Sequence, residues 1–68
     1  MSYIIARRQG RKYEMYVDAD IYGRGHFSNE GKLTDQPVFF HNKSEAFQHL
    51  NGWITKEDGW QYEVEYYE

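Results

Sequence analysis

The sequence predicts a small α+β fold: a mainly antiparallel sheet of three or four strands, with one helix at about residues 43–56 packed on one face. Two patterns support this prediction. Apolar residues between Ala46 and Ile54 recur at helical spacing, and apolar and polar residues alternate over residues 60–67. Because 68 residues have room for one hydrophobic core, we expect a single domain over residues 1–68.

The predicted helix has a start signal, an apolar stripe and a stop signal. Asn42 is a favourable N-cap residue, and Glu45 follows three positions later, as in a capping box. Gly59 is the expected stop. We expect Leu50 and Trp53 to be buried against the sheet, because they belong to one helical stripe. The members of this stripe are Ala46, Phe47, Leu50, Trp53 and Ile54.

Residues 2–19 predict a β-hairpin around a turn at Gln9-Gly10. With a loop of two or four residues, Arg7 faces Lys12, whereas a loop of three residues would shift the register by one. One face of the hairpin then carries Ile4, Ala6, Tyr13, Met15 and Val17. The other face carries Tyr3, Ile5, Glu14 and Tyr16. We expect the helix to cover the first face and water to cover the second.

The rest of the chain predicts a long loop and two more strands. Residues 20–36 hold three glycines among polar residues and predict a loop, in which residues 27–33 are compatible with a short hairpin. Residues 37–41 predict a short strand that leads into the helix. Residues 60–67 predict the last strand, with Tyr62, Val64 and Tyr66 on one side and Glu63, Glu65 and Tyr67 on the other.

Composition and charge disfavour several classes of protein. The formal net charge is −3, whereas generic nucleic-acid binders are usually strongly basic. Residues 1–13 hold four cations and no acid, and residues 57–68 hold five acids and no base. No apolar run is long enough to span a membrane and no signal-peptide pattern occurs, so we expect a cytoplasmic protein without a membrane partner.

No set of residues predicts catalysis, a metal site or a cofactor. Residues 18–23 resemble the start of a calcium loop, but Asn29 stands where that loop requires a bidentate Glu. The three histidines lack the spacing of a helical zinc pair, and we expect them at the surface: His26, His41 and His49. No serine lies in a nucleophile elbow. We therefore expect no enzymatic activity, no metal and no cofactor.

The face turned to water is the predicted protein-binding site. Tyrosines and an isoleucine from the hairpin would join residues of the last strand in an aromatic patch edged with carboxylates. Its residues are Tyr3, Ile5, Tyr16, Glu63, Glu65 and Tyr67. Tyrosines are also ordinary strand formers, so a purely structural role for them stays open.

The basic tip of the hairpin is an alternative site, for nucleic acid. In the predicted register Arg7 opposes Lys12 and Arg8 opposes Arg11, and like charges directly across a strand pair are destabilising. The favoured interpretation is that the last strand lies beside the first and neutralises the arginines with Glu63 or Glu65. The alternative is a basic finger that contacts phosphates.

The chain resembles short phage and prophage proteins in several segments. These are Tyr3-Ile4-Ile5-Ala6, residues 13–18, Phe40-His-Asn-Lys-Ser-Glu45-Ala46 with Leu50, and Tyr62-Glu-Val64. From Ser44-Glu45-Ala46 through Leu50 and Trp53 to Glu63-Val64 it also looks like the small phage-encoded inhibitor of bacterial RNA polymerase. The resemblance implies a protein that blocks a host enzyme or defence complex by occupying its surface, as RNA polymerase inhibitors and anti-CRISPR proteins do. It carries over no catalytic residue.

The residues and the resemblance together predict a non-enzymatic inhibitor or regulator in the cytoplasm of a host cell. Its expected partner is a host protein or protein complex, with nucleic acid as the less favoured alternative. A homodimer is compatible with the sequence.

Overall fold

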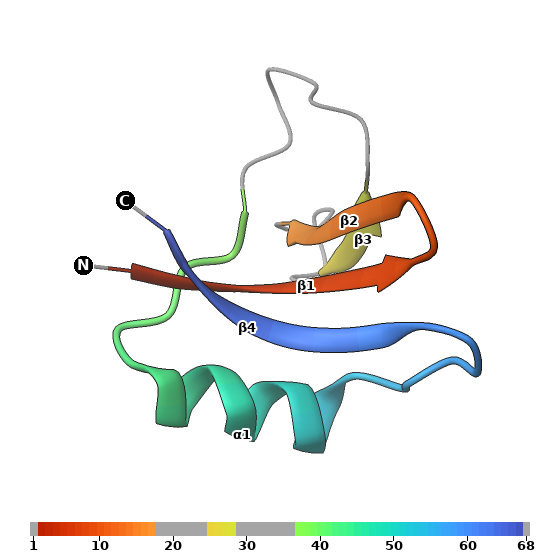
Figure 1. The fold of residues 1–68 in the computed structure, drawn as a ribbon. Coiled ribbons are helices and arrows are strands. Elements are labelled where there is room, and N and C mark those ends of the chain that lie inside the picture. The colour runs from red at the N-terminus through yellow and green to blue at the C-terminus, as the bar shows by residue number, and fades with distance from the viewer. Residues whose placement is uncertain (1, 18–24, 29–36, 68) are drawn as a thin grey trace.

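The described residues form an antiparallel sheet of four strands with a helix against it, in a computed structural model that describes residues 2–17, 25–28 and 37–67 (Figure 1). The elements are β1 (Ser2–Gln9), β2 (Lys12–Val17), β3 (His26–Ser28), α1 (Lys43–Trp53) and β4 (Gln61–Tyr67). The strand order is β3-β2-β1-β4, so β3 and β4 are the edges. The predicted α+β class is confirmed.

The hairpin turns one residue later than the sequence predicted. Gln9 pairs with Lys12, which leaves Gly10 and Arg11 in the turn. Gly10 has a φ of 59°, the positive φ that the first residue of a type II′ turn requires. Arg7 therefore pairs with Glu14 and not with Lys12. Because this register differs from the predicted one by two residues, every side chain stays on its predicted face.

The helix covers the opposite face of the sheet from the one predicted. Ala46 and Leu50 of α1 pack against Ile5 and Tyr16. Around this cluster lie Tyr3, Phe27, Val38, Phe40, Ile54, Tyr62 and Val64. The face turned away from α1 is also buried at its centre, where Ile4, Ala6 and Val17 are at most 2% exposed. Both faces carry apolar residues, so alternation alone did not distinguish the helix side from the other side.

α1 begins where the capping signal predicts but ends three residues early. The Asn42 side chain accepts a hydrogen bond from the backbone N–H of Glu45 at 2.8 Å. Leu50 is 3% exposed, as predicted, but Trp53 is 82% exposed, so its predicted burial is wrong. At about 100° per residue, Phe47 and Trp53 lie about 60° to either side of Leu50, at the two borders of the stripe. Only the centre of the stripe reaches the sheet.

Residues 37–40 join the two halves of the hairpin where β1 and β2 separate. Phe40 and Tyr3 exchange two backbone hydrogen bonds of 2.9 Å, and the N–H of Val38 donates to the carbonyl of Tyr16 at 3.1 Å. The predicted strand at 37–41 is thus reduced to isolated bridges at Pro37 and Phe40.

The third strand of the sheet instead lies within the segment predicted as a loop. β3 pairs with β2, placing Phe27 opposite Tyr16. A loop over all of residues 20–36 is therefore wrong for residues 26–28. The rest of that prediction, at 20–24 and 29–36, and the residues 18–23 compared with a calcium loop lie outside the described residues.

Candidate functional site

The six residues predicted to form one protein-binding patch lie on two different faces. Ile5 is fully buried and Tyr16 is 8% exposed, and Tyr3 packs against the same cluster on the helix side. The β4 residues Glu63, Glu65 and Tyr67 pair with Ala6, Ile4 and Ser2 and share the opposite face with them. The prediction that Tyr3, Ile5 and Tyr16 face water is therefore wrong. Ile5 and Tyr16 belong to the hydrophobic core between the sheet and α1, and Tyr3 packs against that core.

Glu63 and Glu65 lie in a polar cluster with Arg8 and Tyr13. The Arg8 guanidinium donates to Glu63 at 2.6 Å and to Glu65 at 3.5 Å. The Tyr13 hydroxyl donates to Glu65 at 2.9 Å, and the Arg8 guanidinium lies over the Tyr13 ring, 4.5 Å from its centroid. For Arg8, the prediction that acids of a neighbouring last strand neutralise it is confirmed, because β4 lies beside β1 and its glutamates pair with Arg8.

The two carboxyls of this cluster differ in their affinity for a proton. Partial burial and the neighbouring Glu63 raise the pKa of Glu65 above its usual value. The neighbouring Glu65 carboxyl and the hydrogen bond from the Arg8 guanidinium lower the pKa of Glu63 below its usual value. Burial and the hydrogen bond to the Glu65 carboxylate raise the pKa of Tyr13 to about 12. Glu63 therefore keeps its negative charge to lower pH than Glu65 does.

Tyr13→Phe is expected to make the stability of the protein less dependent on pH above 10. The pKa of Tyr13 rises from 10.0 to about 12 on folding, so its stabilising effect is complete below pH 10 and is lost as the pH rises through 12. Tyrosinate absorbance during a pH titration should show a late contribution from Tyr13, and Tyr13→Phe should reduce the late absorbance change by one tyrosine. Tyr66→Phe, at an exposed ring, should keep this late contribution. A late absorbance change of the same size in wild type and Tyr13→Phe would contradict the assignment.

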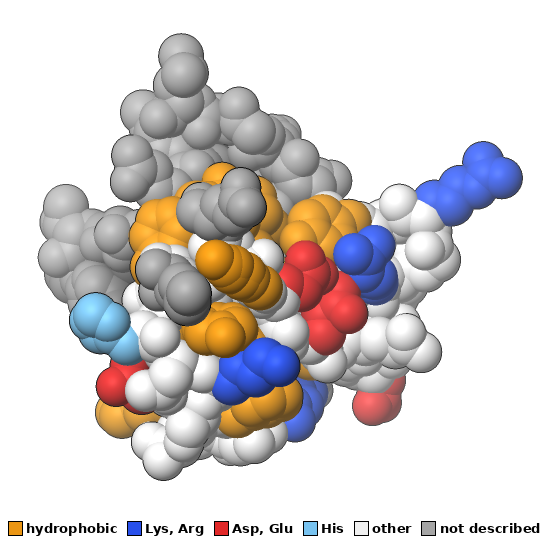
Figure 2. All heavy atoms as spheres, turned by 60° about the vertical axis from the view of Figure 1, so that its left-hand side comes forward, with side chains coloured by type: hydrophobic (Ala, Val, Ile, Leu, Met, Phe, Trp, Pro, Cys, Tyr) orange, Lys and Arg blue, Asp and Glu red, His pale blue; other side chains and the backbone are white. Residues whose placement is uncertain are grey.

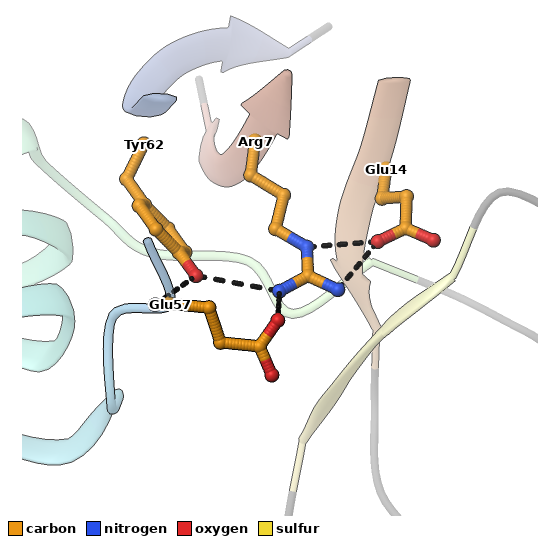
Figure 3. Close-up of polar contacts among 4 residues, drawn as sticks. All are labelled: Arg7, Glu14, Glu57 and Tyr62. Atoms are coloured by element: carbon orange, nitrogen blue, oxygen red, sulfur yellow. Dashed lines mark hydrogen bonds and ion pairs between the residues drawn. The ribbon is translucent and has the colours of Figure 1, made fainter. Parts of the chain in front are cut away.

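Arg7 holds several elements together and is not a free cation (Figure 3). Its guanidinium contacts Glu14 at 2.6 Å, Glu57 at 3.2 Å and the Tyr62 hydroxyl at 3.3 Å. It also lies 4.5 Å from the ring centroid of Phe27 and 4.1 Å from that of Trp60. Burial lowers the pKa of Arg7, but the hydrogen bonds to Tyr62 and Glu14 outweigh it and raise the pKa above the ordinary value. The side chain is 14% exposed, so this cation serves the fold.

The basic tip is smaller than the sequence predicted. The predicted pairs of like charge, Arg7 with Lys12 and Arg8 with Arg11, do not form, because Arg7 faces Glu14 and Arg8 faces Tyr13. Arg11 and Lys12 are exposed, and neither makes an ion pair within the described part of the chain. A phosphate-binding finger would therefore start with two unpaired cations instead of four.

Exposed aromatic rings gather at the end of the molecule where β1 begins and β4 ends. Phe39 is 49% exposed, Tyr66 is 51% exposed and Tyr67 is 38% exposed. The Phe39 and Tyr67 rings are 5.3 Å apart, and Tyr66 lies edge-on to Tyr3 at 5.7 Å. A hollow of about 290 Å³ beside them is lined by Ser2, Phe39, Phe40 and His41. Figure 2 shows hydrophobic side chains across the middle of this side of the molecule, with charged side chains next to them.

We call Phe39, Tyr66 and Tyr67 the aromatic end. Of these, the sequence predicted only Tyr67 as a binding residue. Alternation placed Tyr66 on the helix side, which is correct. The last residues of β4 extend past the core, however, and the Tyr66 side chain is left about half exposed. Phe39 comes directly before Phe40, which forms the β-bridge with Tyr3. Nothing in the sequence marked Phe39 as a binding residue except its place beside another aromatic residue before the helix.

A second hollow, of about 360 Å³, lies at the other end of α1 and includes Trp53, Tyr16 and Gly25 in its lining. A side chain at Gly25 would approach the Tyr16 ring to 2.2 Å, so only glycine fits there. Beside Trp53, His49 is half-buried, with its ring nitrogen 3.2 Å from the Tyr16 hydroxyl. The prediction that all three histidines lie at the surface is therefore wrong for His49.

Neither a metal-binding cluster nor a membrane span is found in the part of the chain that the structure describes. No three histidine or acidic side chains are gathered as metal ligands among residues 2–17, 25–28 and 37–67. In the same residues, no helix combines the length and the apolar character needed to cross a membrane.

Comparisons with protein-family models, curated proteins and solved structures found no significant match to this chain. The resemblance to short phage-encoded inhibitors stays a prediction from the residues quoted for it.

Proposed function

We propose that this chain is a non-enzymatic protein-binding domain that inhibits or regulates its partner by occupying the partner's surface. One observation carries the proposal: at the aromatic end, three large aromatic residues are 38% to 51% exposed, namely Phe39, Tyr66 and Tyr67. Aromatic side chains are enriched among the residues that contribute most to binding energy. Phe39 and Tyr67 are exposed in contact with each other, and large apolar groups exposed side by side are a liability unless a partner covers them.

The rings of the aromatic end are already held in place, which favours binding. Tyr67 contacts Phe39, and Tyr66 contacts the half-buried ring of Tyr3. Each ring therefore loses little conformational freedom when a partner covers it. The resemblance to phage-encoded inhibitors suggests a host enzyme or a defence complex as the partner, and a cell's cytoplasm as the place where the two meet.

Nucleic-acid binding is the second candidate, and the charges disfavour it. Arg7 and Arg8 are paired with glutamates, and the chain has a net charge of −3. Tight, sequence-independent binding of DNA or RNA at physiological salt would reverse the order of the two candidates.

Phe39→Ser and Tyr67→Ser are each expected to weaken binding to the partner by about fivefold to 150-fold, because each removes an aromatic anchor worth roughly 1 to 3 kcal/mol. The partner is first isolated from host lysate by affinity capture, identified by mass spectrometry and purified. The affinities of wild type and variants for the purified partner are then compared by calorimetry.

Trp53→Ser is the matched control, because Trp53 is 82% exposed and lies at the other end of α1 from the aromatic end (Figure 1). It should bind as tightly as wild type. If Trp53→Ser loses affinity while the two variants at the aromatic end keep it, the proposed surface is the wrong one. Melting temperatures of all variants show whether a loss of binding is a loss of folding.

A further inference from the structure

Among the described residues, nothing pairs with the row of backbone hydrogen-bonding groups along the outer edge of β4. β4 pairs with β1 on one side and is the last strand of the sheet on the other. Within the described part of the chain, no residue forms a hydrogen bond to this outer edge. An open edge of seven residues is a template for another strand, and proteins usually shorten or cover such edges.

The register identifies the groups that point outward. Tyr3 exchanges both of its backbone hydrogen bonds with Phe40, so its N–H and C=O point away from β4. The pair of Tyr3 with Tyr66 is therefore a non-hydrogen-bonded pair, and the pattern alternates along an antiparallel ladder. It follows that the N–H and C=O groups of three β4 residues point outward: Tyr62, Val64 and Tyr66.

The side chains between these positions are acidic. Glu63 and Glu65 lie on the sheet face turned away from α1, where one guanidinium, that of Arg8, is shared between two carboxyls. β4 carries two acids and no base, and Arg8 offsets one of the two negative charges, so the charge along this edge stays negative. A strand added to β4 would place every second side chain next to these glutamates.

A second copy of the chain is a poor occupant of this edge. In the antiparallel registers centred on Glu63, Val64 or Glu65, a glutamate of one copy faces a glutamate of the other, and directly opposed like charges are destabilising. A strand with Lys or Arg opposite Glu63 and Glu65 would instead be stabilised by the attraction between opposite charges. The acidic pattern therefore selects against self-pairing in these central registers and for a basic partner.

We infer that the edge of β4 binds an extended segment of the partner protein that carries Lys or Arg at every second position. The inference rests on the proposed function and names the chemistry of the partner. The segment pairs antiparallel with β4, exchanging backbone hydrogen bonds with Tyr62, Val64 and Tyr66, and its cations lie beside Glu63 and Glu65. Tyr66 and Tyr67 belong both to β4 and to the aromatic end, so the two surfaces are continuous.

The test uses a capped peptide of about ten residues in which Lys and Val alternate, a length typical of strands. Binding to isotope-labelled protein is followed by NMR. We expect the amides of Tyr62, Val64 and Tyr66 to become protected from solvent exchange about tenfold or more, since they gain hydrogen bonds. A peptide in which Glu replaces every Lys should not bind, and Glu63→Gln with Glu65→Gln should weaken the Lys-Val peptide about tenfold.

Backbone methylation of the peptide separates strand addition from simple charge attraction. When Val lies opposite the three outward residues, the Val N–H groups point at β4 and the Lys N–H groups point away. Methylation of the Val nitrogens should weaken binding about tenfold or more, because it removes the donors of the ladder. Methylation of the Lys nitrogens is the matched control and should keep the affinity within about threefold.

Several outcomes would overturn the inference. These are no binding of the Lys-Val peptide, equal binding of the peptide methylated at Val, and binding that leaves the three amides unprotected. Protection of these amides in the protein alone at high concentration would show pairing with a second copy and would overturn it too. Each of these outcomes leaves the proposed function intact, because that function is tested with the native partner and the variants at the aromatic end.

Discussion

Leu50→Ala is expected to lower the free energy of unfolding by roughly 2 to 5 kcal/mol. Leu50 is 3% exposed and packs with Ala46 of the helix against Ile5 and Tyr16 of the sheet. Truncation removes apolar contacts and leaves a cavity at the centre of the helix–sheet interface. Since a small domain has a total stability of about 5 to 15 kcal/mol, the loss is a large part of the whole. Urea unfolding followed by tryptophan fluorescence measures it.

Trp53→Ala tests the same helix without touching the core. The ring is 82% exposed, so the substitution should cost less than about 1 kcal/mol, although a larger apolar side chain is removed. Its unfolding is followed by circular dichroism, which does not depend on the lost indole. If Trp53→Ala costs as much as Leu50→Ala, the helix is turned differently about its axis from the arrangement described.

Arg7→Met is expected to lower the free energy of unfolding by roughly 2 to 4 kcal/mol, somewhat less than for a fully buried ion pair because the site keeps some contact with water. Methionine keeps an apolar stem between the rings of Phe27 and Trp60 but removes the cation. Glu14, which is 17% exposed in the native structure, is then left without its partner. Arg7→Lys should recover only part of the loss, because an ammonium cannot reproduce the planar fork of contacts. Urea unfolding of each variant gives the values.

A double substitution separates the ion pair from packing. Arg7→Met together with Glu14→Met should cost less than the sum of the two single substitutions, because no unpaired charge remains. Arg11→Ala is the control at an exposed cation of the same hairpin and should change the stability by less than about 0.5 kcal/mol. An Arg7→Met effect as small as that of Arg11→Ala would show that the network in Figure 3 adds nothing to stability.

Part of the candidate site could be predicted from the sequence. Alternation over residues 60–67 placed Glu63, Glu65 and Tyr67 together on one face, and the basic hairpin implied that an acidic strand lies beside it. The alternation did not reveal that Phe39 joins Tyr67, because the contact links residues far apart in the chain. It also did not reveal the open edge of β4, since an edge is defined by the strand order of the whole sheet.

The sequence by itself determined the local elements of this protein. Asn42 and Glu45 specify the start of α1, and strict alternation specifies β4, because hydrogen-bond capping and side-chain period act between near neighbours. Tertiary structure alone decided which face of the sheet α1 covers. Ile4 and Val17 on one face and Ile5 and Tyr16 on the other are all apolar enough to be buried, and all are. The choice between them depends on how closely Ala46 and Leu50 pack onto Ile5 and Tyr16, a property of complementary shapes that no period in the sequence records.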